Sequence, residues 1–194
     1  DSFEHMPALA MRMPCGALTS LAGNVDRHHR VAVADLILVQ SRVRSTVERL
    51  LQELQPDIVG LSVMTFQRGT AAGLARFVRT RLPRARIVVG GYDPSLAPAA
   101  YEACEDVDFI VRGEGEHTFR DLVRGIEPGA SVDGIPGLSH RAASGGWRRN
   151  PPRAVLRLAS EPLGLPNRGA RVLDGYTLLG RQIDVVETSR GCTD

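Results

Sequence analysis

The spacing of apolar residues from residue 14 to 126 alternates between two periods. Apolar positions three and four apart are typical of helices with one buried face, whereas consecutive apolar positions are typical of strands buried on both faces. The first pattern predicts helices at 17–25, 43–54, 69–82, 95–104 and 119–126. The second predicts strands at 31–37, 57–63, 86–91 and 108–112. Ser41 is placed to cap the second helix and Pro56 to end it.

Such alternation predicts an α/β fold in which a doubly wound parallel sheet, Rossmann-like or flavodoxin-like, carries helices on both faces. We assign it to residues 1–128. After Pro128 the composition shifts to Gly, Ser, Pro and Arg. Residues 129–182 are expected to form a hairpin around the glycine turn at 142–146, followed by an extended proline-rich linker that wraps a neighbouring element. Residues 183–194 predict a new strand and a loop with Cys192.

Composition excludes several classes of function. The chain has 194 residues, 43% of them hydrophobic, and a net charge of +2; all 24 basic residues are Arg. Without lysine, a pyridoxal phosphate anchor or a P-loop is excluded. The absence of lysine also argues strongly against a receiver-like or other flavodoxin-like regulatory module, which needs a lysine beside its acidic phosphorylation pocket. The near-neutral charge argues against a nucleic-acid partner, and no apolar run is long enough for a membrane span.

Three cysteines without a paired spacing argue against a disulfide framework and favour a cytoplasmic location. The chain begins without Met and stops soon after Cys192, so we expect it to be cut from a longer polypeptide.

Candidate chemistry lies in three loops that follow predicted strands, because ligands of open parallel sheets bind at the carboxyl ends of the strands. The candidate cofactor-binding residues are Ser62, Thr65, Gly90, Gly91, Tyr92, Gly113, Glu114, Gly115 and Glu116. Each loop also has a plainer interpretation: a cap on the next helix, a tight glycine turn, or an acidic residue that complements a helix dipole. RGEGEHT lacks the third glycine of a dinucleotide fingerprint.

Taken together, SVMT, VVGG and VRGEGE resemble the N-terminal cobalamin-binding domain of B12-dependent radical S-adenosylmethionine (SAM) enzymes. The segment from IPGLSHR to WRRNP resembles the hairpin that follows this domain, and ETSRGCTD resembles the start of the radical SAM motif. In that motif three cysteines hold a 4Fe-4S cluster, and one iron is left open for S-adenosylmethionine.

The resemblance implies a cobalamin-binding module that takes part in methyl transfer from S-adenosylmethionine through methylcobalamin. The cofactor's tail would insert between sheet and helices, beside the nine loop residues. Cys192 would be a cluster ligand, and the partners would be a radical SAM barrel of the same polypeptide and a small-molecule substrate. The sequence lacks the D-x-H-x-x-G motif, and His28 and His29 are interpreted as surface residues. The alternative is a degenerate domain that presents substrate or docks the barrel without cobalamin.

Overall fold

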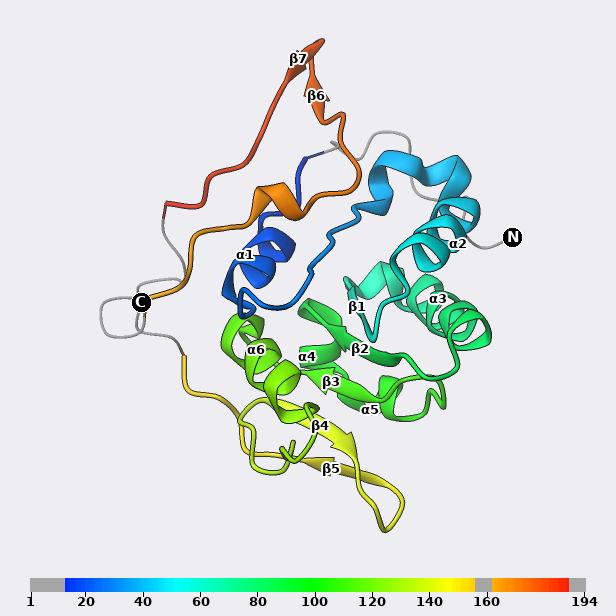
Figure 1. Cartoon of the computed structure of the whole chain (residues 1–194), viewed down its shortest axis with the longest axis vertical. Coiled ribbons are helices and arrows are strands. Elements are labelled where there is room, and N and C mark those ends of the chain that lie inside the picture. Colours follow the sequence, from blue (N-terminus) through cyan, green and yellow to red (C-terminus); the bar gives the residue numbers. More distant parts are fainter. Residues whose placement is uncertain (1–12, 156–161, 189–194) are drawn as a thin grey trace.

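A five-stranded mixed sheet forms the centre of the molecule in the computed structural model, which describes residues 13–155 and 162–188 (Figure 1). Its strands lie in sequence order, and they are β1 (Ile58–Ser62), β2 (Arg86–Gly90), β3 (Phe109–Val111), β4 (Leu138–Arg141) and β5 (Trp147–Arg149). Strands β1, β2 and β3 are parallel, whereas β4 and β5 pair antiparallel beyond β3. The α/β class is confirmed, and the expected hairpin extends the same sheet.

Helices cover both faces of this sheet. They are α1 (Gly16–Asn24), α2 (Val43–Leu54), α3 (Arg68–Arg81), α4 (Tyr92–Leu96), α5 (Pro98–Glu102) and α6 (Gly115–Gly125). Ile87 and Val89 of β2 pack in one core with α2, α3 and α5, whereas Val88 packs in a second core with α6. This alternation along one strand explains why its apolar run is continuous. Figure 1 shows α1 and α6 on one side and α2 and α3 on the other.

Three local predictions differ from the structure. The single helix expected at 95–104 is two short helices, because the backbone turns at Ala97 and Pro98 starts α5. Ser41 does not cap α2, since a 3-10 helix, η1 (Leu36–Arg42), runs directly into it. Helix α2 does end before Pro56, and Gln55 closes it in a left-handed conformation (φ 44°).

The strand predicted at 31–37 is wrong. Val33 makes one isolated parallel bridge to Arg171 rather than joining the sheet. Its N–H donates to the carbonyl of Ala170 (2.7 Å) and its carbonyl accepts from Val172 (2.9 Å). The later segment of the chain therefore takes the backbone hydrogen bonds that a neighbouring strand would have used. Ala22, Val33 and Ala170 form a small separate core.

The later segment, residues 162–188, contacts α1 through residues 164–170. The Asn167 N–H donates to the carbonyl of Thr19 (2.8 Å), and the Gly164 N–H donates to Asn24 Oδ1 (2.9 Å). The segment contains η3 (Arg168–Ala170) and a small hairpin of β6 (Thr177–Leu178) and β7 (Arg181–Gln182). The strand predicted from residue 183 is not formed over 183–188, where the backbone has no strand partner.

Cys192 lies outside the described residues. None of the helices in the described part of the chain combines the length and the apolar character needed to cross a bilayer.

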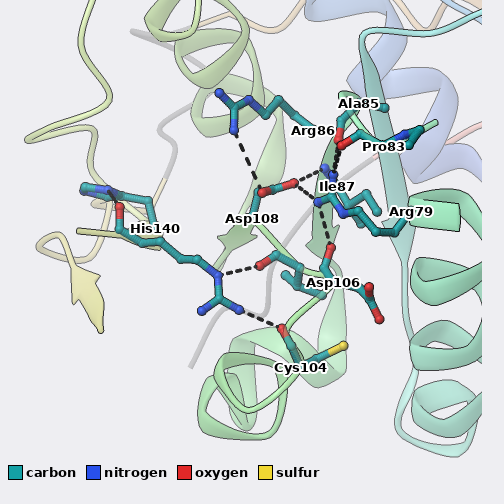
Figure 2. Close-up of polar contacts among 11 residues, drawn as sticks. Arg79, Pro83, Ala85, Arg86, Ile87, Cys104, Asp106, Asp108 and His140 are labelled. Atoms are coloured by element: carbon teal, nitrogen blue, oxygen red, sulfur yellow. Dashed lines mark hydrogen bonds and ion pairs between the residues drawn. The ribbon is translucent and has the colours of Figure 1, made fainter. Parts of the chain in front are cut away.

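An ion cluster closes the amino edge of the sheet, where the parallel strands begin (Figure 2). Asp108, just before β3, accepts from Arg79 Nη2 (2.6 Å) and from the Ile87 N–H (2.7 Å). Arg79 also donates to the carbonyls of Pro83, Ala85 and Asp106. One arginine of α3 thus joins the turn before β2 to the turn before β3.

Candidate functional site

The carboxyl edge of the parallel strands brings the three sequence-predicted loops together. Ser62 at the end of β1 is in register with Gly90 at the end of β2, so the two loops leave the sheet at the same level. The Val63 N–H donates to the Gly90 carbonyl (2.9 Å), and the Asp93 N–H donates to the Val63 carbonyl (3.1 Å). These bonds make the first two loops one connected unit.

Gly91 is required by the fold at this point. Its φ is +102°, and a Cβ would lie 2.9 Å from Val63 N and 3.2 Å from Ser62 Oγ. The missing side chain therefore makes room for the neighbouring loop rather than for a ligand. A Cβ on Gly90 would point at Val111 Cβ, 3.4 Å away. Neither position therefore leaves space for a flat ligand, because both face protein atoms.

The third loop is tied to the second by Ser95, which the sequence analysis did not single out. Its hydroxyl donates to the Gly91 carbonyl (2.7 Å) and accepts from the Gly113 N–H (2.9 Å). A Cβ on Gly113 would meet nothing within 4 Å, so this loop position is open. Gly115, the first residue of α6, lies against Leu21 of α1. The three loops thus share one edge and are held together by a serine.

Two charged residues of the third loop serve its neighbours. Glu116 is buried, with 5% of its surface exposed, and accepts from Ser20 Oγ of α1 (2.8 Å). Arg112 donates to the carbonyls of Leu138 and Asn150 in the hairpin. Glu114 occupies the N-cap position of α6 without a side-chain capping bond. Glu116 is thus a link between α6 and α1 as well as an acidic residue at the start of a helix.

Large apolar side chains are exposed on this edge. Met64 and Phe66 follow β1, and Tyr92 and Leu96 follow β2; between 46% and 73% of each is accessible to solvent. Ser62 and Thr65, beside them, are also exposed. We call these six residues the loop surface. Single exposed hydrophobics are ordinary, but several grouped at a strand-end edge are typical of a binding site.

Beneath the loop surface lies a buried charge that sequence reasoning missed. Asp93 is 1% exposed and accepts two bonds from Arg68 at the start of α3 (both 2.8 Å) and one from Tyr101 Oη of α5 (2.6 Å). The bonds from Arg68, then from Tyr101, hold the pKa of the Asp93 carboxyl far below its usual range. Desolvation and the bond to Asp93 raise the pKa of Tyr101.

This network fixes how the second loop leaves β2, because Asp93 is only two residues after the Gly91 turn and is held from two helices. A signal for it was present in the sequence, since an aspartate stands two residues after the paired glycines. Its partners, however, lie 25 residues before it and 8 after it. Spacing alone could not select Arg68 among 24 basic residues.

The chain is similar to several known proteins. The family model described as B12 binding domain matches residues 7–123. An uncharacterized methyltransferase from Pyrococcus horikoshii is 32% identical over 176 residues, which are 90% of this chain and 38% of that protein.

Two solved structures share the fold. The cobalamin-dependent S-adenosylmethionine radical enzyme OxsB with aqua-cobalamin bound has a TM-score of 0.70 and 23% identity, over 82% of this chain and 22% of that chain. The radical S-adenosylmethionine methyltransferase TsrM from Kitasatospora setae, with cobalamin and a 4Fe-4S cluster bound, has a TM-score of 0.58 and 27% identity, over 72% and 28%. The chain spans well under half the length of each of these three proteins.

Proposed function

Because the chain belongs to the B12-binding domain family, we propose that it binds cobalamin on the loop surface at the carboxyl edge of β1, β2 and β3. The family includes relatives that are cobalamin-dependent radical SAM methyltransferases. The observation that carries the proposal is the group of exposed apolar side chains at this edge, Met64, Phe66, Tyr92 and Leu96. A large, flat, partly apolar ligand would remove them from water, at a gain of roughly 25 cal/mol per Å² covered.

The residues of the chain divide into two roles in this proposal. Ser62, Thr65 and Tyr92 are exposed and carry hydroxyl groups suited to the amide side chains of a corrinoid. Gly113 leaves its side of the third loop open. Gly90, Gly91 and Glu116 keep the loops in position, and Gly115 lets α6 begin close to α1. Asp93 fixes the second loop from beneath.

The reaction that we propose for the intact polypeptide is methyl transfer from S-adenosylmethionine to a small-molecule substrate. When bound, cobalamin supplies a metal centre able to accept and pass on a methyl group. The 4Fe-4S cluster and S-adenosylmethionine would belong to a radical SAM barrel of the same polypeptide, with Cys192 of the SRGC sequence as one cluster ligand. The names of the methyltransferase relatives support this reaction.

Corrinoid titration tests the proposal on the full chain. The protein is incubated with hydroxocobalamin, free corrinoid is removed by gel filtration, and the visible spectrum of the protein fraction is recorded. We expect about one corrinoid per chain, since one edge of one sheet forms the site. A chain that retains none would overturn the proposal and favour a docking domain without cobalamin.

A pair of variants locates the site. Phe66→Ser combined with Tyr92→Ser should weaken corrinoid binding about tenfold or more, because an aromatic contact contributes on the order of 1 kcal/mol. Val155→Ser is the matched control: its side chain is 82% exposed, follows β5 and is not part of the loop surface. Equal affinity in the double variant and the control would place the corrinoid elsewhere. Cys192→Ala should leave corrinoid binding unchanged, because we propose that Cys192 binds the 4Fe-4S cluster and not the corrinoid.

A further inference from the structure

Two histidines and a glutamate meet at the end of the α1–α6 pair opposite the loop surface. His28 and His29 lie in the turn after α1, and Glu127 lies two residues after α6 ends. Their side-chain ligand atoms all lie within 4.8 Å of one another. We propose that His28, His29 and Glu127 form a binding site for a divalent transition-metal ion, with Zn²⁺ as the best fit.

The distances match those between ligands on one metal ion. His28 Nε2 and His29 Nε2 each lie 3.3 Å from Glu127 Oε1. Zinc bonds of about 2.0–2.2 Å to nitrogen and oxygen, at tetrahedral angles, place neighbouring ligand atoms about 3.3–3.5 Å apart. A small movement of the exposed His28 ring is enough to admit the ion, since its side chain is 66% exposed.

The turn that carries both histidines is built before any metal binds. The His29 N–H donates to the Asp26 carbonyl (3.1 Å), which closes the turn. The Asp26 carboxylate accepts two bonds from Arg124 in the last turn of α6 (2.6 and 2.7 Å). The same two elements that supply the ligands are therefore already joined by an ion pair, and a pre-positioned ligand set loses less freedom on binding.

One nitrogen of the cluster lacks a hydrogen bond. His29 Nε2 is covered by protein atoms and makes no hydrogen bond within the described chain, although Glu127 lies 3.3 Å away. A buried polar atom of this kind is costly unless something satisfies it. Coordination to a metal ion would satisfy it, because a neutral imidazole nitrogen and a carboxylate oxygen are both ligands that zinc accepts.

The site leaves a coordination position for water. Three protein ligands complete only part of a tetrahedral zinc shell. His29 and Asp26 also line a cavity of about 510 Å³ between the end of α1 and residues 164–167, so there is space beside the site. The site is independent of the proposed cobalamin function, because the loop surface follows the ends of β1 and β2 whereas Glu127 lies beyond the carboxyl end of α6. Bound zinc would join α1 to α6 at their far end.

The test is a Zn²⁺ titration of the full, untagged chain in competition with a chromophoric chelator. We expect one ion per chain at this site, and a Tm about 5 °C or more higher when zinc is about a hundredfold above its Kd. His28→Gln, His29→Gln and Glu127→Gln should each weaken binding at least about tenfold, because even the loss of a residue that orients a ligand costs 10–100-fold. Glu53→Gln, on the exposed face of α2, is the control and should bind as the wild type does.

Substitution by Co²⁺ separates this site from the cysteines, because thiolate ligands add an intense near-ultraviolet charge-transfer band that imidazole and carboxylate ligands lack. We expect the weak visible bands alone, and their loss in the His28→Gln/His29→Gln double variant. Zinc binding and a Tm increase that are unchanged in this double variant would overturn the proposal. Corrinoid binding should be the same in this variant as in the wild type, so failure of one proposal does not imply failure of the other.

Discussion

The two edges of the central sheet are both rich in arginine and aspartate but differ in what they expose. At the amino edge, Asp108 and Arg79 bond to each other and to the surrounding backbone, and the cluster presents no large apolar side chain (Figure 2). At the carboxyl edge, Asp93 and Arg68 pair beneath loops that expose Met64 and other apolar residues. At both edges the aspartate and the arginine are bonded within the fold. Only the carboxyl edge also leaves large apolar side chains exposed to water.

This difference supports the carboxyl edge as the proposed ligand site. Both ion clusters hold turns in place, so an aspartate–arginine pair does not by itself mark a functional site. Exposed apolar area above a buried, rigid network is a better indicator of a binding site. The network keeps the loops fixed, and covering the apolar side chains with a ligand still lowers the free energy.

The largest effect is expected at Gly91. Gly91→Ala should lower the free energy of unfolding by about 2–4 kcal/mol, because the new Cβ meets the Val63 backbone at 2.9 Å and φ is +102°. Chemical denaturation measures the loss. Gly129→Ala is the matched control: φ is also positive, at +86°, but nothing lies within 4 Å of the new Cβ. It should cost about 1 kcal/mol. Equal losses would mean that backbone strain alone, and not the packing of the two loops, requires glycine at 91.

A smaller effect separates the two aspartates. Asp108→Asn should lower the free energy of unfolding by about 2 kcal/mol, since the Arg79 and Ile87 donors lose a charged acceptor. It should leave the Kd for hydroxocobalamin unchanged. Asp93→Asn should lower stability and also weaken corrinoid binding, because Arg68 and Tyr101 no longer hold the second loop. The measurements are denaturation and the gel-filtration titration. Corrinoid binding that is equally affected by both changes would remove the distinction between the edges.

The smallest effect is a pH dependence. The pKa of Asp93 is lowered by its bond from Arg68, so its stabilising contribution is complete above the unfolded value of about 3.9 and is lost as pH falls through the folded pKa. The free energy of unfolding should therefore decline more steeply below about pH 4 in the wild type than in Asp93→Asn. Asp184→Asn provides a comparison, because its bond from Arg171 lowers the pKa of Asp184 to about 2. Identical slopes in the wild type and Asp93→Asn would contradict the Arg68–Asp93–Tyr101 network.

The regular elements with strong periodicity were predictable. The stripe of Ala71, Leu74 and Val78 placed α3, and the continuous apolar run before Gly90 placed β2 with both faces covered. The sequence could not show that residues 31–37 form no strand of the sheet, because their apolar pattern is that of a strand. Their pairing is decided by Ala170 and Val172, which lie beside Val33. Local pattern describes what a segment can form, while competition between distant segments decides its partner.

The candidate site was predictable as a location. Loops after parallel strands must meet at one edge, so the sequence could group Ser62, Gly91 and Gly113 without any coordinates. The roles within that group were not predictable. Whether a glycine makes room for a ligand or for a neighbouring loop depends on which atoms face its missing side chain, and those atoms belong to Val63 and Val111.

The sequence by itself determined the fold class and the chemistries that an absence of lysine excludes, and it selected the edge that we propose for ligand binding. The tertiary structure alone decided that Asp93 is buried between Arg68 and Tyr101, that Glu116 faces Ser20, and that His28, His29 and Glu127 converge. The physical reason is range. Periodicity and turn chemistry act over a few residues, whereas a pair such as His28 and Glu127, 99 residues apart, is brought together only when two helices pack.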